Sequence, residues 1–144
     1  MERLIKTVSL SVVCLCFSSC YESRHVDFHS YQELSEYSFI SDGWIPEVMG
    51  QDACAIQETY DINNNHLFGK FDFRNRPVYD SIFKSCVVVQ EDSLFAKIDA
   101  IKKPRCPKWF IPKERFLKSN YLMVKQQDFY LIMDRKKNIM YYLR

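Results

Sequence analysis

The chain has 144 residues, a net charge of +2, 15% aromatic residues and only three glycines. The aromatic content and scarcity of glycine exclude an intrinsically disordered chain, and the length suffices for one domain with a core of its own. Residues 20–101 carry 6 Lys/Arg against 14 Asp/Glu, whereas residues 102–144 carry 12 against 3. The simplest interpretation is that both segments pack in one domain and their fields largely cancel. The alternative is a basic face for anionic headgroups or an acidic partner.

Residues 1–19 have the pattern of a secretory signal peptide. Arg3 and Lys6 give a weakly positive start, and an apolar stretch of about 13 residues and small residues follow. A membrane-spanning helix needs about 20 apolar residues, so export is the better interpretation than a permanent span.

Phe17-Ser18-Ser19-Cys20 resembles the lipobox of bacterial lipoproteins. The resemblance implies that Cys20 is lipidated and becomes the first residue of the mature chain, with an ordinary signal peptide and an incidental cysteine as the alternative. In this family an Asp after the lipidated cysteine implies retention in the inner membrane. Here Tyr21 follows Cys20, which implies the bacterial outer membrane, with the domain facing the periplasm. A triacylated cysteine anchors stably, because each buried methylene contributes about 0.8 kcal/mol. We expect residues 20–29 to be the lipidated cysteine and a tether.

Three cysteines remain in the mature domain: Cys54, Cys86 and Cys106. Because the periplasm is oxidising, one disulfide among them is one expectation, and three buried free thiols are the other. The sequence leaves all three pairings open.

The first predicted element after the tether is a short helix over residues 31–39. Ser30-x-x-Glu33 fits a capping box, in which each side chain accepts a backbone N–H of the first turn. Asp42-Gly43 predicts a turn, and Pro46 suits the start of a further helical turn that Gly50 ends.

Residues 53–73 predict a β-hairpin. Residues 53–62 alternate in the manner of a strand, Asn63, Asn64 and Asn65 indicate a turn, and a second alternating run follows. Asp61, Asn63 and Asn65 also resemble the first half of a calcium loop, but His66 stands where that loop needs glycine. We therefore favour a hairpin turn.

The second half of the chain predicts further strands. Residues 74–80 are expected to be a connection, residues 87–89 favour a strand, residues 91–103 favour a helix, and residues 104–112 are expected to be irregular. Three strands are predicted at 121–124, 129–133 and 138–143. The expected fold is α+β: residues 30–144 form a single globular domain with an antiparallel sheet of about five strands and two or three short helices.

Several of these motifs together resemble a family of small uncharacterised bacterial lipoproteins. The matching motifs are Gly-Trp-Ile-Pro at 43–46, the Asp-Ile-x-x-Asn hairpin turn at 61–65, a Trp-x-x-Pro element at 109–112 and a Tyr-rich C-terminal hairpin at 129–143. The resemblance implies a fold pattern for residues 30–144 and no established activity.

The sequence contains no motif of a known type of active site. It lacks a nucleophile elbow, a phosphate loop, a Cys-x-x-Cys pair and a dinucleotide-binding glycine pattern. His66 is the only histidine base for a cysteine nucleophile such as Cys54, and His25 and His29 are too few for a metal site. We therefore expect no enzyme, no metal and no cofactor.

Two groups of residues stand out for another role. Trp44, Pro46, Trp109 and Pro112 form two similar Ile-Pro sites, which we interpret as structural corners. The basic side chains around the second site form a candidate binding segment for a membrane surface or an acidic protein. They are Lys102, Lys103, Arg105, Lys108, Lys113 and Arg115.

These features lead to one principal hypothesis of function, a lipid-anchored envelope protein whose domain binds a protein partner without catalysis. An immunity-type lipoprotein, which neutralises a toxin in the periplasm, is one specific form of it. A membrane-surface module that uses residues 102–115 is the alternative, and a cryptic enzyme is a third. The expected contacts are the membrane, through the lipid, and an unidentified envelope protein. No nucleic-acid partner is expected, and the oligomeric state is left open.

Overall fold

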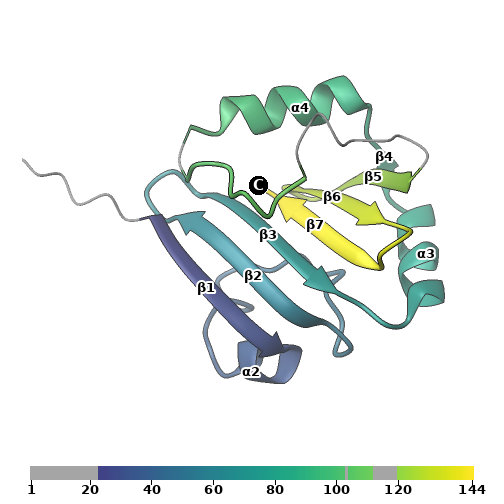
Figure 1. Cartoon of the computed structure of the whole chain (residues 1–144), viewed down its shortest axis with the longest axis horizontal. Helices are drawn as coiled ribbons and strands as arrows, with labels where there is room; N and C mark the ends of the chain where they lie inside the picture. The colour runs from purple at the N-terminus through teal and green to yellow at the C-terminus, as the bar shows by residue number, and fades with distance from the viewer. Residues whose placement is uncertain (1–22, 103, 112–119) are drawn as a thin grey trace, which may run out of the picture.

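The computed structural model describes residues 23–102, 104–111 and 120–144. Seven strands form one antiparallel sheet in the order β1-β2-β3-β7-β6-β5-β4 (Figure 1). The strands are β1 (Ser23–Ser30), β2 (Cys54–Asp61), β3 (His66–Asp72), β4 (Val87–Val88), β5 (Tyr121–Gln126), β6 (Phe129–Asp134) and β7 (Ile139–Leu143). The helices are α2 (Tyr31–Ser35), α3 (Arg76–Lys84) and α4 (Glu91–Ala100). The α+β prediction is confirmed, and β4 confirms the strand expected at residues 87–89. The expectation of about five strands was wrong, because the sheet has seven and β1 was not expected.

Strand β1 corrects the prediction that residues 23–29 belong to a tether. The strand pairs with β2 along its length, and Phe28 lies opposite Ile56 with only 5% of its surface exposed. Val26 and Phe28 alternate with the exposed residues His25, Asp27 and His29. A strand with one buried face shows such a period of two. The segment was predicted to be a linker because most of its residues are polar.

Helix α2 begins where the capping pattern predicts, but its hydrogen bonds differ from those of a reciprocal box. The Ser30 hydroxyl accepts the Glu33 N–H at 3.2 Å, while the Glu33 carboxylate accepts the His29 N–H at 2.7 Å instead of that of Ser30. The helix also ends at Ser35, before residue 39. Beyond it the chain turns back, so that the rings of Tyr37 and Phe39 pack against Phe28.

Helix α3 was missed by the sequence interpretation, which treated residues 74–80 as a connection. Pro77 lies in the first turn of this helix, where its missing N–H costs no hydrogen bond. Tyr79 and Phe83 are buried one helical turn apart. The polar residues around them hid this apolar stripe.

The hairpin predictions are confirmed for β2–β3, β5–β6 and β6–β7. Asn65 and Asn138 adopt the positive φ that their turns require, at 53° and 56°. Two buried aspartates hold these turns. Asp61 Oδ1 accepts the backbone N–H groups of Asn63 and Asn64, and Asp134 Oδ1 accepts those of Lys136 and Lys137.

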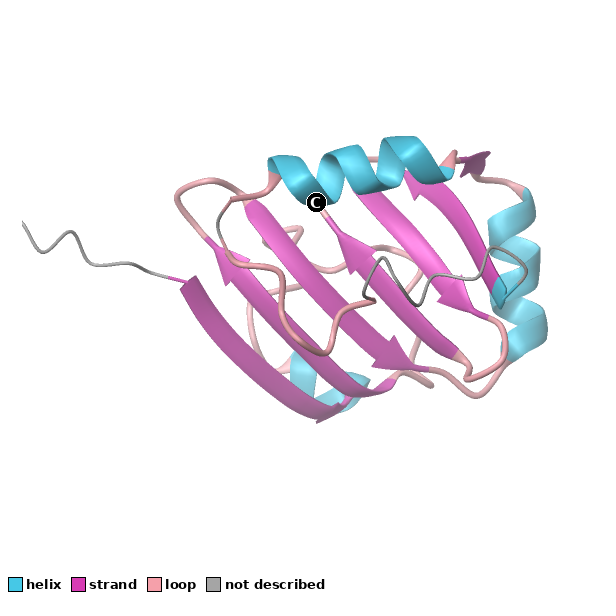
Figure 2. Cartoon of the chain, turned by 45° about the horizontal axis from the view of Figure 1, so that its top comes forward, coloured by secondary structure: helices cyan, strands magenta, loops and turns pink. Residues whose placement is uncertain are grey.

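The sheet carries a hydrophobic core on each face. The first core lies under α2, α3 and residues 44–53 and includes residues from β1, β2, β3, β5, β6 and β7. The second core lies under α4 and residues 101–111 and takes its sheet residues from β3, β5, β6 and β7 only. The two faces are therefore covered to different extents (Figure 2).

Two further structural findings bear on the sequence predictions. Cys54, Cys86 and Cys106 are all free thiols, so the structure contains none of the three disulfide pairings considered. No helix in the described residues has the length and apolar character needed to cross a membrane. Residues 1–19 and Cys20 lie outside the described part of the chain.

Candidate functional site

One face of the sheet divides into a polar half and an apolar half. The strand register places Asp27, Gln57, Lys70, Tyr141, Ile132 and Met123 in one row across β1, β2, β3, β7, β6 and β5. Tyr141, Ile132 and Met123 belong to the second core, whereas Asp27 is exposed and Gln57 is half-buried. Among the residues that the structure describes, the second core thus ends between β3 and β2.

We call the uncovered part of this face the open face. It consists of His25, Asp27 and His29 from β1 and of Gln57 and Thr59 from β2. None of these residues belongs to either core. Figure 2 shows that α4 lies over the opposite part of the sheet, away from β1 and β2.

The border of the open face is formed by Trp109 and Lys70. The Lys70 ammonium lies 5.7 Å from the centre of the Trp109 ring, a distance that allows a cation–π contact. Next to Trp109, Phe110 is 2% exposed and packs against Phe68 with ring centres 5.0 Å apart. Phe110 and Ile111 therefore fill the second core, and Trp109 lies beside the open face.

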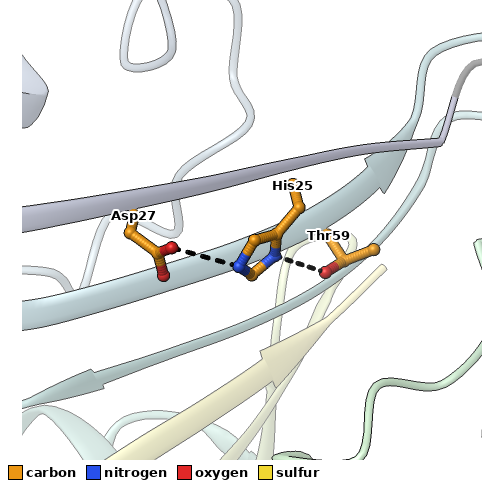
Figure 3. Close-up of polar contacts among 3 residues, drawn as sticks. All are labelled: His25, Asp27 and Thr59. Carbon is orange, nitrogen blue, oxygen red and sulfur yellow. Dashed lines mark hydrogen bonds and ion pairs between the residues drawn. The ribbon is translucent and has the colours of Figure 1, made fainter.

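A polar network lies within the open face (Figure 3). His25 Nδ1 is 3.0 Å from the Thr59 hydroxyl, and His25 Nε2 is 3.1 Å from Asp27 Oδ2. When the neutral ring carries its proton on Nε2, that N–H donates to Asp27 and the Thr59 hydroxyl donates to Nδ1. The network fixes the orientation of the imidazole on the strand surface.

The same three residue types occur in nucleophilic catalysis, but their setting here favours a surface role. The side chains of His25 and Asp27 are 47% and 58% exposed, so water screens their interaction. Thr59 lies in β2 and pairs with His25 on β1 and with Phe68 on β3. An activated nucleophile instead needs a dry site with donors aimed at the developing oxyanion.

Strand β1 also gives the domain a long free edge. It has eight residues, and no strand within the described part of the chain pairs with its outer side. An aromatic hollow of about 530 Å³ adjoins this edge. Its lining residues are Arg24, His25, Val26, Asp27, Phe28, Tyr37, Phe39 and Tyr60. Backbone donors and acceptors, aromatic rings and the open face thus meet along one side of the molecule.

The basic segment predicted from the sequence is only partly placed. Lys102, Arg105 and Lys108 are exposed, while Lys103, Lys113 and Arg115 lie outside the described residues. The apolar residues between them turn inward, since Phe110 and Ile111 are 2% and 7% exposed. Trp109 is half-buried. In the described residues, the segment combines inward aromatic packing with solvated cations.

The first Ile-Pro site forms a corner at the other side of the sheet. Gly43 has a φ of +71°, Pro46 is buried, and its carbonyl accepts the Met49 N–H at 2.9 Å. Trp44 is half-buried rather than fully buried, with its ring 5.3 Å from that of Tyr60 and 4.6 Å from the Arg144 guanidinium. Of the second site, Pro112 lies outside the described residues.

A buried glutamate in the first core has a raised pKa, and the sequence analysis did not single it out. Glu58 is fully buried in the first core, and its carboxyl accepts a hydrogen bond from the Tyr142 hydroxyl. Burial raises the pKa of Glu58 to about 8, against the opposing effects of that bond and of the Arg144 charge. Its only sequence signal is a charged residue on the apolar side of an alternating strand. Glu58 does not line the hollow beside β1, and because its side chain is completely buried it bears on the packing and the pH dependence of the domain.

Other candidate pairs are separated by the fold. Cys54 pairs with Asp72 at one end of the β2–β3 hairpin, whereas His66 pairs with Asp61 at the other end. The structure therefore does not bring this thiol and imidazole together. In the described residues no three His, Cys, Asp or Glu side chains lie close enough together to hold a metal ion.

Residues 22–72 match the family model described as the YbbD head domain. The matched segment contains β1, α2, β2 and β3, and with them every residue of the open face. No curated protein matches the chain, and no solved structure matches it. The match supports a relationship to a small bacterial family of unknown role. It covers Gly43 to Pro46 and Asp61 to Asn65 but ends before Trp109.

Proposed function

We propose that this chain is a lipid-anchored protein of the bacterial cell envelope, whose domain binds a protein partner and has no catalytic role. The observation that carries the proposal is the open face beside a free strand edge. Within the described residues, the first core takes side chains from six strands, including β1 and β2, whereas the second core on the other face takes none from β1 or β2.

The chemistry of this surface suits a protein partner. An extended segment can pair with the free edge of β1, where main-chain hydrogen bonds supply affinity. The side chains of Asp27, Gln57 and Thr59 can then give specificity, because they present acceptors and donors in fixed register. An immunity-type role, in which the partner is a toxin, is the specific form of this proposal.

The alternative of a membrane surface contacted by residues 102–115 receives less support. Apolar residues that insert into a bilayer interface should be exposed. Phe110 and Ile111 instead fill the second core. Charge reversal at Lys102, Lys103 and Arg105 tests this alternative: if it weakens liposome binding in a salt-dependent manner, these cations contact the membrane.

The test of the principal proposal is crosslinking of the full chain in its native envelope, read by mass spectrometry. We expect one stoichiometric protein neighbour. The double variant Asp27→Ala/Gln57→Ala should lower the crosslinked fraction by roughly tenfold, which corresponds to about 1.4 kcal/mol. Val78→Ala is the control, because Val78 is 47% exposed on α3, away from the open face. Repeated absence of a neighbour, or equal losses in both variants, would count against the proposal.

The lipid anchor is tested separately. A Cys20→Ser full chain should leave the membrane fraction while keeping its fold. If this variant still partitions with membranes to the same extent, Cys20 is not the anchor.

A further inference from the structure

The register of the sheet brings several distant segments to the end at which the chain enters the domain. Ser23 pairs with Asp61, and Asp61 pairs with His66. Leu67 on β3 exchanges two backbone hydrogen bonds with Arg144, which follows β7, at 3.2 and 3.4 Å. At the same end, Phe129 on β6 pairs with Gln126 on β5. We call this end of the sheet, with residues 62–65 and 127–128 in its turns, the tether end.

The tether end lies close to the proposed anchor. Only Tyr21 and Glu22 separate Cys20 from Ser23. Three residue steps span at most about 11 Å, since an extended chain advances up to about 3.6 Å per residue. If Cys20 is lipidated, the tether end is therefore held within that distance of the residue that carries the acyl chains.

A basic hollow opens at the tether end. It has a volume of about 320 Å³ and is lined by Asn64, Asn65, His66, Lys97, Lys125, Asp128, Tyr130 and Arg144. Lys97 comes from α4 and Lys125 from β5, and neither has an ion-pair partner among the described residues. Among the side chains of the lining, Asp128 carries the carboxylate, and Lys97, Lys125 and Arg144 carry cations.

Arg144 is held rigidly at the edge of this hollow. Its Nη1 donates to the Gly43 carbonyl at 2.7 Å, and its Nη2 donates to the Asn65 side chain. The guanidinium also lies 4.6 Å from the Trp44 ring centre and 5.4 Å from that of Phe129. Beside the hollow, the turn exposes Ile62, of which 47% is accessible. The Lys125 ammonium lies 5.5 Å from the centre of the Tyr130 ring. An exposed apolar tip next to Lys97 and Lys125, which have no ion-pair partner among the described residues, matches the chemistry of a phospholipid interface.

We propose that the tether end faces the bilayer and that the hollow takes the phosphate of an anionic phospholipid headgroup. This inference rests on the proposed lipid anchor at Cys20 and adds an orientation to it. The strands then run away from the membrane. The open face is turned sideways, where a partner can reach it.

The opposite end of the sheet provides a test of this orientation. It carries Arg135, Lys136 and Lys137, all exposed, in the β6–β7 turn. Eight residues of β1 separate the two ends, about 25 Å at a rise of roughly 3.3 Å per residue. Screening at physiological salt has a length of about 8 Å, so these cations are too distant to sense a membrane at the tether end.

The experiment uses the full lipidated chain in vesicles of phosphatidylcholine, with or without 30% phosphatidylglycerol. A photo-crosslinking amino acid replaces either Ile62 or Val78, which are equally exposed at 47%. We expect phospholipid adducts, measured by mass spectrometry, to be at least fivefold more abundant from position 62. Lys97→Glu/Lys125→Glu should lower the position-62 yield severalfold in phosphatidylglycerol vesicles, while Lys136→Glu/Lys137→Glu should leave it unchanged.

Two results would overturn the inference while the anchor stands. One is an equal yield from positions 62 and 78 in a protein whose membrane association depends on Cys20. The other is a position-62 yield that responds neither to phosphatidylglycerol nor to Lys97→Glu/Lys125→Glu. If Cys20→Ser leaves membrane association unchanged, the anchor itself fails, and the two failures are thereby distinguished.

Discussion

The hydroxyl of Tyr142 donates a hydrogen bond to the carboxyl of Glu58 across the backbone of Gly69. The register accounts for this contact, because Glu58 pairs with Gly69, and Gly69 pairs with Tyr142 on the other side. All three residues lie on the face of the first core, where Glu58 and Tyr142 are completely buried. This contact joins β2, in the segment that carries the open face, to β7.

The first prediction concerns the pH dependence of stability. Because burial raises the pKa of Glu58 to about 8, the folded protein keeps this proton at neutral pH, whereas the unfolded chain releases it near the ordinary value of 4.5. Between these values the unfolded state binds fewer protons, so the contribution of Glu58 to the free energy of unfolding falls as pH rises. The free energy of unfolding falls by at most about 1.4 kcal/mol per pH unit through this group. Above pH 8 its contribution no longer changes with pH.

Glu58→Gln removes this titration while keeping the shape of the side chain. We expect urea unfolding between pH 5.5 and 7.5 to show a loss of about 1–3 kcal/mol in the native protein beyond any loss in the variant. Parallel pH profiles for the two proteins would show that Glu58 does not retain its proton in the folded state.

The second prediction concerns the close approach of Tyr142 to Gly69. A Cβ at position 69 would lie 2.1 Å from Tyr142 Cζ, a distance at which the ring has to move. We expect Gly69→Ala to lower the free energy of unfolding by about 1–3 kcal/mol, as overpacking of a core does.

A double-mutant cycle separates this clash from a general effect on the strand. Tyr142→Leu removes the ring, so Gly69→Ala should cost much less in the Tyr142→Leu background than in the native protein. Additive costs would show that the ring does not require the glycine.

The third prediction compares neighbouring aromatic residues in the second core. Phe110 is 2% exposed between Phe68 and Tyr141, whereas Trp109 is only half-buried. Phe110→Ala should therefore lower the free energy of unfolding by about 3–5 kcal/mol, and Trp109→Ala by clearly less. Thermal unfolding of both variants measures the order, and the reverse order would contradict the described packing. Trp44 is also only half-buried, so Trp44→Ala should lower the free energy of unfolding by less than the loss of a fully buried tryptophan would.

The fourth prediction concerns the free thiols. Cys106 is exposed, whereas Cys54 and Cys86 are half-buried. Under native conditions a neutral alkylating reagent should label Cys106 first, although burial of its sulfur raises the pKa of this thiol and slows the reaction. Peptide mass spectrometry then reads the order of labelling. A native protein in which two cysteines resist alkylation until a reductant is added would contain the disulfide that the structure lacks.

The hairpins were predictable because their signals are local. The signals of the β2–β3 hairpin all lie within 20 residues of the sequence. They are the alternation in both strands and the asparagines of the turn, and together they predict two strands and the reversal of the chain between them. The capping serine Ser30 likewise marked the start of α2. In contrast, β1 was hidden because His25, Asp27 and His29 face solvent on an edge strand, where half of the alternation is polar.

The candidate site was not predictable for a different reason. The open face exists only because α4 and residues 101–111 cover part of a sheet whose order is not the order of the chain. No single segment carries that information. The contact of Tyr142 with Glu58 is also set by the pairing of β3 with β7, two strands far apart in the sequence.

Site-specific photo-crosslinking in the native envelope tests whether the open face binds a protein partner. A photo-crosslinking amino acid is placed at Gln57 on the open face or at Val78 on α3, in a protein of unchanged thermal stability. We predict one discrete protein adduct from position 57, lost with Asp27→Ala, and none from position 78. The same adduct pattern from both positions, or no protein adduct from position 57 in the native envelope, would contradict the claim.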